Sequence, residues 1–205
     1  MDEVLEELDW VVGSLMEEIE ARKLPVNMVV VSDHGMATVD PEDHIRIDGI
    51  LPKWREMIEW IDFGPVTSIW PKEESADAVY EALSAAAAGE HYRVYKRGEF
   101  PAEWNYDRMD STRIPPLVIL CEVGYVMDFE KAKPADIFGY HGYDPESAEM
   151  RAIFLARGPD ITRELLVRDP VLNVDLYPLM TRLLQIDSVT KAVNGTDYLA
   201  NIVMG

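Results

Sequence analysis

The chain has 205 residues, 48% of them hydrophobic, and its 38 acidic residues outnumber the 19 basic ones. The formal net charge of −19 disfavours nucleic-acid duplexes and anionic membranes as non-specific partners, since like charges repel. No apolar run approaches the roughly 20 residues that a membrane-spanning helix needs. We therefore expect an α/β domain with a sizeable core and no membrane segment.

An amphipathic helix is expected first, because apolar residues recur at three- and four-residue intervals from Val4 to Ile19. Its opposite face is acidic, which is typical of a solvated surface. Residues 1–7 are also acidic, whereas a secretory signal peptide begins with basic residues, and so we expect no targeting segment there.

The apolar run at residues 28–31 stops abruptly before Asp33 and His34. A run of this kind predicts a strand that is covered on both faces, and ligands gather beyond the carboxyl ends of strands in open α/β sheets. Asp33 and His34 are therefore candidate metal ligands. Gly35, which has no Cβ, is expected to let the chain turn sharply beside them.

The middle of the chain predicts further elements of an α/β fold. Buried strands are expected near residues 66–70 and 117–120, and a helix at residues 75–88, which Ser75 is placed to cap. His44 and Asp48 precede these elements and are expected to be surface-loop residues.

The single cysteine, Cys121, lies in an apolar run and has no second cysteine to pair with. We expect it to be a buried small hydrophobic residue.

His141 lies in the sequence Gly-Tyr-His-Gly-Tyr-Asp at residues 139–144 and, like His34, is followed by a glycine. A strand-like run at residues 151–156 follows it, and Asn173 or Asp175 is placed to cap a last helix. Two histidine–glycine loops beside two strands are placed to converge on one site.

Four motifs together resemble one known family. They are Ser-Asp-His-Gly-Met at residues 32–36, the motif at 139–144, Ala-Arg-Gly-Pro at 156–159 and Asn-Val-Asp-Leu-Tyr-Pro-Leu-Met at 173–180. In this order and spacing they resemble the nucleotide pyrophosphatase/phosphodiesterase family of the alkaline phosphatase superfamily. The resemblance covers nearly the whole chain, but only the C-terminal part of that family's catalytic domain.

The resemblance implies the fold and the setting of the protein. It implies an alkaline-phosphatase-like α/β fold with a central, mainly parallel sheet flanked by helices and incomplete at the N-terminal side. Strands near 28–31, 66–70, 117–120 and 151–156 would form this sheet. Residues 1–205 would then be a single partial domain, which in the family is extracellular or membrane-anchored with an extracellular catalytic domain.

The resemblance also implies a two-zinc site and a nucleotide or phosphodiester substrate. Asp33 and His34 match ligands of one zinc, and His141 matches a ligand of the other. Carboxylates and imidazoles suit zinc, and two metal ions can neutralise a phosphate, activate a nucleophile and stabilise the leaving oxygen.

The departures from the family pattern predict a weak site. The threonine nucleophile and half of the zinc ligands of the family have no counterpart, and neither Ser32 nor Thr38 occupies the nucleophile motif. Pro145 stands where the family usually has Asn. We therefore expect poor zinc affinity and an isolated chain that is nearly inert.

Other interpretations stay open at this point. The chain could be a non-catalytic binding or structural protein that retains the fold, or a phosphomonoesterase of the same superfamily. Hydrolysis by the chain alone would require a different nucleophile and a site completed by His44 or Asp144. An uncovered sheet edge would also favour self-association.

Overall fold

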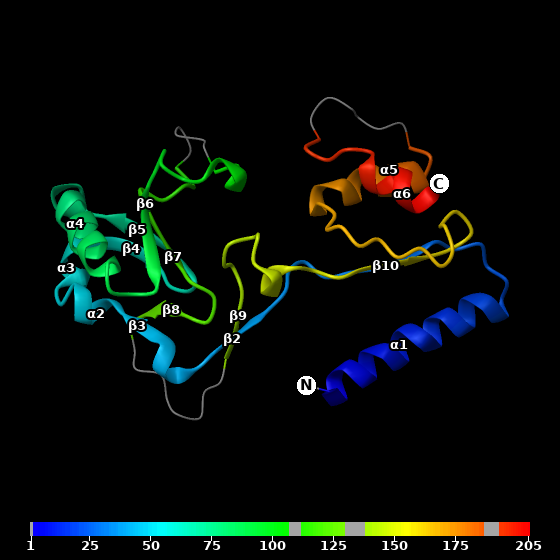
Figure 1. Cartoon of the computed structure of the whole chain (residues 1–205), viewed down its shortest axis with the longest axis horizontal. Helices are drawn as coiled ribbons and strands as arrows, with labels where there is room; N and C mark the ends of the chain where they lie inside the picture. The colour runs from blue at the N-terminus through cyan, green and yellow to red at the C-terminus, as the bar shows by residue number, and fades with distance from the viewer. Residues whose placement is uncertain (1, 107–111, 130–137, 187–192) are drawn as a thin grey trace. The chain divides into compact units, whose positions relative to one another are not determined.

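The computed structural model describes residues 2–106, 112–129, 138–186 and 193–205 (Figure 1). The chain divides into two compact units. Unit 1 comprises Met1–Val31 and Phe154–Gly205, and unit 2 comprises Ser32–Ile153. The expected single partial domain over residues 1–205 stays a prediction.

Unit 2 is built around a four-stranded antiparallel sheet with the strand order β4-β5-β7-β6. Its strands are β4 (Ile58–Asp62), β5 (Val66–Pro71), β6 (Tyr92–Lys96) and β7 (Leu117–Cys121). All five residues of β7 are buried, as expected for an apolar strand between two neighbours. The expected strands at 66–70 and 117–120 are confirmed and pair with each other.

Helices of unit 2 lie beside this sheet in Figure 1. They are α2 (Ile47–Ile50), α3 (Trp54–Met57) and α4 (Ala76–Ala87). α4 confirms the helix expected at 75–88, and it buries Val79 and Leu83. The Tyr92 hydroxyl on β6 donates to the Leu83 carbonyl at 2.8 Å, which fixes α4 against the sheet. The expected cap is wrong, because Ser75 makes no side-chain capping hydrogen bond.

Four shorter strands of unit 2 form two further ladders. They are β2 (Ala37–Val39), β3 (His44–Arg46), β8 (Val126–Asp128) and β9 (Phe138–Tyr140). β2 pairs antiparallel with β9, and β3 pairs parallel with β8. Sequence patterns did not predict them, since strands of three residues carry no readable alternation.

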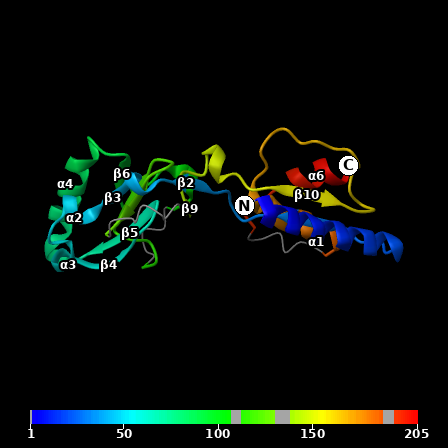
Figure 2. The same ribbon diagram turned by 90° about the horizontal axis from the view of Figure 1, so that it is seen from below.

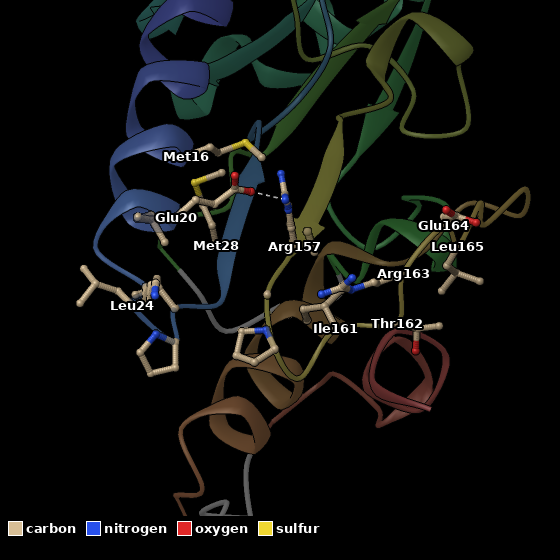
Figure 3. A pocket seen from close by; sticks show the side chains of 17 residues that line it. Met16, Glu20, Leu24, Met28, Arg157, Ile161, Thr162, Arg163, Glu164 and Leu165 are labelled. Carbon is tan, nitrogen blue, oxygen red and sulfur yellow. Dashed lines mark hydrogen bonds and ion pairs between the residues drawn. The ribbon is translucent and has the colours of Figure 1, made fainter.

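Unit 1 combines helices with one antiparallel strand pair. Its elements are α1 (Asp2–Ala21), β1 (Met28–Val31), β10 (Phe154–Arg157), α5 (Leu176–Leu183) and α6 (Tyr198–Met204). α1 confirms the first expected helix, and β1 pairs with β10. In Figure 2 the ribbon of α1 overlaps that of β10, and Glu20 of α1 forms an ion pair with Arg157 of β10 (Figure 3). Leu179, Leu199 and Val203 of α5 and α6 form the centre of a small core.

The expected direction of strand pairing needs correction. Among the described strands, only the β3–β8 ladder is parallel. The run expected at 151–156 pairs with residues 28–31 in unit 1, whereas residues 66–70 and 117–120 belong to the sheet of unit 2. The physical reason is that strand direction depends on which distant segments meet: residues 66–70 and 117–120 pair antiparallel although a long connection joins them, and local composition carries no signal for this.

Asp175 precedes α5 but does not cap it. Its carboxylate is buried and accepts hydrogen bonds from the backbone N–H of Thr196 at 2.7 Å and from the Thr196 hydroxyl at 3.1 Å. The expected capping role is therefore wrong. The carboxylate instead joins the start of α5 to the segment before α6.

Cys121 is buried at the end of β7, as expected. Burial raises the pKa of its thiol to about 12. Of the helices that the structure describes, none is long and apolar enough to cross a membrane.

Candidate functional site

The candidate site begins where β1 ends, and Ser32 anchors this point. The Ser32 backbone N–H donates to the Ile153 carbonyl at 3.3 Å, and the Ile153 N–H donates to the Ser32 hydroxyl at 3.0 Å. Ser32 thus fixes the start of the loop that carries Asp33 and His34.

Gly35 is required by close packing. Its N–H donates to the Met150 carbonyl at 3.0 Å, and a Cβ at this position would lie 1.9 Å from the carbonyl oxygen of Glu149. The sequence predicted a sharp turn, but Gly35 is not among the residues with positive φ. What the missing side chain permits is the approach of the 149–151 backbone, which holds the Asp33–His34 loop in place.

Asp33 and His34 face each other. Asp33 Oδ1 accepts a hydrogen bond from the His34 backbone N–H at 3.0 Å, and Asp33 Oδ2 lies 3.3 Å from His34 Nε2. His34 Nδ1 lies 2.7 Å from the Gly35 carbonyl oxygen. Because a carbonyl only accepts, Nδ1 is the donor in this hydrogen bond, and Nε2 is the ring nitrogen that faces the carboxylate.

This arrangement suits a cation or a proton between the two side chains. Metal–ligand distances of about 2.0–2.2 Å in a tetrahedral zinc site place neighbouring ligand atoms roughly 3.4 Å apart, close to the 3.3 Å between Asp33 Oδ2 and His34 Nε2. A metal-ligating histidine also typically donates its other N–H to a backbone carbonyl, as His34 does.

His141 is brought to the same place by the β2–β9 ladder, since it directly follows β9. Its ring stacks on that of His34, with 3.7 Å between ring centroids and an interplanar angle of 15°. Gly142 has a φ of +104°, a conformation that suits glycine and turns the chain beyond His141. The expected convergence of the two histidine–glycine loops is thus what the structure shows.

The ligand set is nevertheless partial. In residues 2–106, 112–129, 138–186 and 193–205, no group of three or more His, Cys, Asp or Glu side chains could hold a metal ion. Asp33 and His34 fit a metal as a pair, and the ring of His141 stacks on that of His34. Their ligand roles stay a prediction.

His44 is not the loop residue that the sequence predicted. It lies in β3, its side chain is 4% exposed, and its Nδ1 is 3.3 Å from Asp128 Oδ2. Its Nε2 is buried and finds no hydrogen-bond partner among the described residues. Tyr140 meets the ring edge-on, and burial together with the Asp128 charge raises the pKa of that tyrosine. The pairing joins positions 84 residues apart, so no local pattern could have revealed it.

The remaining candidates have structural or surface roles. Asp48 is half-exposed and paired with Arg46, which is consistent with a surface residue. Asp144 Oδ1 accepts from the Glu146 N–H at 2.9 Å, so it stabilises the turn that contains Pro145. Thr38 is an exposed residue of β2, opposite Gly139.

Tyr143 supports the His141 loop from the core. Its hydroxyl donates to the Tyr125 carbonyl at 3.0 Å, and burial raises its pKa to about 12. This residue was not singled out from the sequence, where an aromatic beside a glycine carries no specific signal.

Solved structures share this fold. Human ectonucleotide pyrophosphatase/phosphodiesterase 5 superposes with a TM-score of 0.86 at 32% identity, over 98% of this chain and 52% of that chain. The murine protein of the same name gives a TM-score of 0.83 at 34% identity, over 96% and 51%. The chain therefore has the expected alkaline-phosphatase-like α/β fold.

Sequence comparison gives the family. Residues 1–144 match the family described as type I phosphodiesterase / nucleotide pyrophosphatase. Human ectonucleotide pyrophosphatase/phosphodiesterase family member 5 is 35% identical over 191 residues, which are 92% of this chain and 38% of the human protein. A Xenopus laevis protein named bis(5'-adenosyl)-triphosphatase enpp4 is 31% identical over 91% of this chain and 39% of its own length.

The chain belongs to the type I phosphodiesterase / nucleotide pyrophosphatase family, as its motifs predicted. The family name describes hydrolysis of phosphodiester and nucleotide pyrophosphate bonds. The chain spans about half the length of the solved relatives and about two fifths of the curated ones.

Proposed function

We propose that this chain supplies one part of a zinc-dependent catalytic domain that hydrolyses nucleotide pyrophosphate or phosphodiester bonds. Asp33 and His34 would hold one zinc ion, and His141 would belong to the other. The observation that carries the proposal is the stacking of the His34 and His141 rings. Their centroids are 3.7 Å apart, although the two loops lie more than 100 positions apart in the sequence.

The residues of this chain have distinct roles in the proposal. Zinc, when bound, supplies positive charge that neutralises the phosphate oxygens and the leaving oxygen. The Gly35 carbonyl holds the Nδ1 proton of His34 and so keeps Nε2 available as a ligand. Asp33 contributes negative charge from a side chain that is 84% exposed, where a zinc ion can reach it.

Relatives favour a nucleotide as the substrate class. One solved relative is an inactive form of the murine protein in complex with AMP, and the frog relative is named a bis(5'-adenosyl)-triphosphatase. With a net charge of −19, this chain would repel such an anion unless bound cations offset that charge. The relatives are named ectonucleotide enzymes, which supports an extracellular setting for the site.

Zinc content tests the ligand assignment. We expect the purified chain to hold well under one zinc ion by elemental analysis, because the donor set is partial. His34→Ala and His141→Ala should each lower the residual zinc affinity by about 10- to 100-fold. His91→Ala is the matched control, since this exposed histidine contacts Glu122 and Tyr125 instead. Zinc binding that is unchanged in His34→Ala and His141→Ala would contradict the assignment.

Hydrolysis tests the activity. We expect almost no turnover of bis-p-nitrophenyl phosphate by the chain with added zinc, since no residue matches the family's threonine nucleophile. Adding the N-terminal half of a relative's catalytic domain, as a separate chain or fused upstream of residue 1, should restore hydrolysis that a chelator abolishes. Robust hydrolysis by the 205-residue chain alone would refute the partial-site proposal.

A non-catalytic role is the second candidate. It is favoured by the observation that no group of three metal-binding side chains occurs in the described part of the chain. If the completed domain binds nucleotide without hydrolysing it, this candidate replaces the first. Preference for p-nitrophenyl phosphate over its diester would instead indicate a phosphomonoesterase.

A further inference from the structure

One face of the β2–β9 ladder (Figure 1) carries a methionine beside the candidate ligand His141. Ala37 pairs with Tyr140 at the end of the ladder, and the next position in register sets Met36 opposite His141. Successive side chains of a strand point to opposite faces. Ala37 is buried in the core, whereas Met36 is 53% exposed and His141 is exposed as well. Met36 and His141 therefore share the solvent-facing side of the ladder.

Met36 packs across Gly139 on this face. A Cβ added at Gly139 would lie 2.9 Å from the Cγ of Met36 and 3.0 Å from its Sδ, so the thioether occupies the space that a side chain would take. Methionine suits such a gap because its side chain is unbranched and flexible. Gly139 stands two positions before His141, and Met36 stands two positions after His34. The contact thus joins the two segments that carry the histidines.

The stacked rings depend on how these two segments are held together. The ladder has three residue pairs, and a short two-stranded pair is marginally stable by itself. An aromatic pair adds little stability of its own. The 3.7 Å between the ring centroids of His34 and His141 is therefore set by where the two backbones lie. A side chain that joins the segments at the site end of the ladder fixes this separation.

Other contacts of the two loops hold each loop to a different neighbour. In the first loop the Gly35 N–H donates to the Met150 carbonyl, and the second loop is held to the core through the Tyr143 hydroxyl. Neither hydrogen bond joins one histidine loop to the other. The contact between Met36 and Gly139 does so, and it lies close to both histidines in the sequence.

We propose that Met36 is a positioning residue of the candidate site. By packing across Gly139 it holds the site end of the β2–β9 ladder closed and keeps the His141 ring on that of His34. The inference rests on the proposed function, in which both histidines are zinc ligands. The ring geometry exists without zinc, so it can be measured separately from zinc binding.

The first test is the geometry of the two rings in the metal-free full chain. With isotopically labelled histidine, NMR should show a nuclear Overhauser cross-peak between the His34 and His141 rings, since their centroids are 3.7 Å apart. We expect Met36→Ala to abolish this cross-peak and Met36→Leu, which has a similar volume, to keep it. Met180→Ala is the matched control, because it removes an exposed methionine from α5 in unit 1.

His91 separates a positioning role from a general loss of structure. Its ring stacks on Tyr125, with 3.9 Å between centroids, and it is not part of the β2–β9 ladder. The His91 signals should therefore be the same in Met36→Ala as in the parent chain. Signals of His34, His91 and His141 that all move together would show that Met36 acts on folding in general, which overturns the positioning role.

The second test asks whether Met36 acts through Gly139. Gly139→Ala places a Cβ where the thioether lies and should displace it. We expect Met36→Ala and Gly139→Ala each to weaken zinc binding about tenfold, measured by the shift of the His34 ring signals during a zinc titration. The double variant should bind no more weakly than either single variant, because both substitutions remove the same contact. Gly49→Ala is the control, since nothing lies within 4 Å of a Cβ added there.

The contrary results are distinct. A parent chain without the cross-peak, or a cross-peak that persists in Met36→Ala, overturns the inference whatever the zinc affinity. Additive losses in the double variant also overturn it, because Gly139 would then act independently of Met36. Loss of the cross-peak with unchanged zinc affinity refutes the ligand roles in the proposed function, and with them a role of Met36 in metal binding.

Discussion

Unit 2 and unit 1 differ in how fully they bury their apolar side chains. In unit 2 a continuous core extends from Ala37 to Met150 and includes the centre of the four-stranded sheet. In unit 1 the buried cluster of described residues is limited to Ile161 and a few residues of α5 and α6, while apolar residues of α1 such as Val4, Leu5 and Leu8 are exposed.

This difference indicates where the stability of the chain comes from. Buried apolar area is the main favourable contribution to folding, so unit 2 has the means to hold the Asp33–His34 loop and His141 in place by itself. Exposed apolar area contributes nothing to folding until something covers it, so the apolar residues of α1 add little to the stability of unit 1. Substitutions in the two units should therefore have different consequences.

The largest effect is expected in the core of unit 2. Ile119→Ala removes a fully buried side chain from the central strand β7 and should lower the free energy of unfolding by about 2–5 kcal/mol. Leu8→Ala on the exposed face of α1 should cost less than about 0.5 kcal/mol. Urea unfolding followed by circular dichroism measures both, and similar losses would break the comparison.

The next effect is at the site loop. Gly35→Ala places a Cβ where the Glu149 carbonyl oxygen lies, and both are backbone-fixed, so we expect a loss of about 1–3 kcal/mol. Gly49→Ala is the control, because nothing lies within 4 Å of a Cβ added there. Urea unfolding of the two variants is the measurement. Equal stability would show that the Gly35 packing is not a constraint.

In unit 1, Asp175→Ala should cost about 1–3 kcal/mol, because the Thr196 N–H loses its acceptor. Hydrogen exchange should show faster amide exchange around Thr196, with β7 unchanged if the units are stabilised separately. Asp169→Ala, at an exposed position, is the control. Faster exchange in both units would indicate that they unfold together.

Alkaline pH should affect unit 2 by a smaller amount. Burial raises the pKa of Tyr92 and of Tyr143 from about 10 to about 12. Between these values the unfolded chain has lost protons that the folded chain keeps, so stability is full below pH 10 and falls as pH rises towards 12. We expect on the order of 1 kcal/mol per group at pH 11.

The urea midpoint measured from pH 9 to pH 11 checks this expectation. Tyr143→Phe should lower stability at neutral pH, since the bond to the Tyr125 carbonyl is lost, but it should flatten the pH dependence. A pH dependence as steep as that of the parent chain would exclude Tyr143 as a source.

The sequence predicted the long periodic elements and missed the short ones. α1 and α4 have apolar spacing that only a helix satisfies, and β7 is an unbroken apolar run. β3 and β8 have three residues each, and their existence depends on pairing between distant segments. Strand direction was mispredicted for the same reason, because it is set by which strands meet and not by local composition.

The sequence predicted that the two histidine–glycine loops meet, but not the packing that supports them. Asp33, His34 and His141 were found from their motifs, and the structure brings the two histidine rings together. The Gly35–Glu149 approach could not be predicted, since it depends on a backbone more than 100 positions away. The burial of His44 against Asp128 is likewise a tertiary effect.

The rate at which Cys121 is chemically modified reports on local opening of the sheet of unit 2. The thiol is the single one in the chain, it lies at the end of the central strand, and at neutral pH it is protonated and therefore a poor nucleophile. A disulfide reagent can modify the thiol only after β7 separates from its neighbours. The labelling rate therefore measures how often the sheet of unit 2 opens locally.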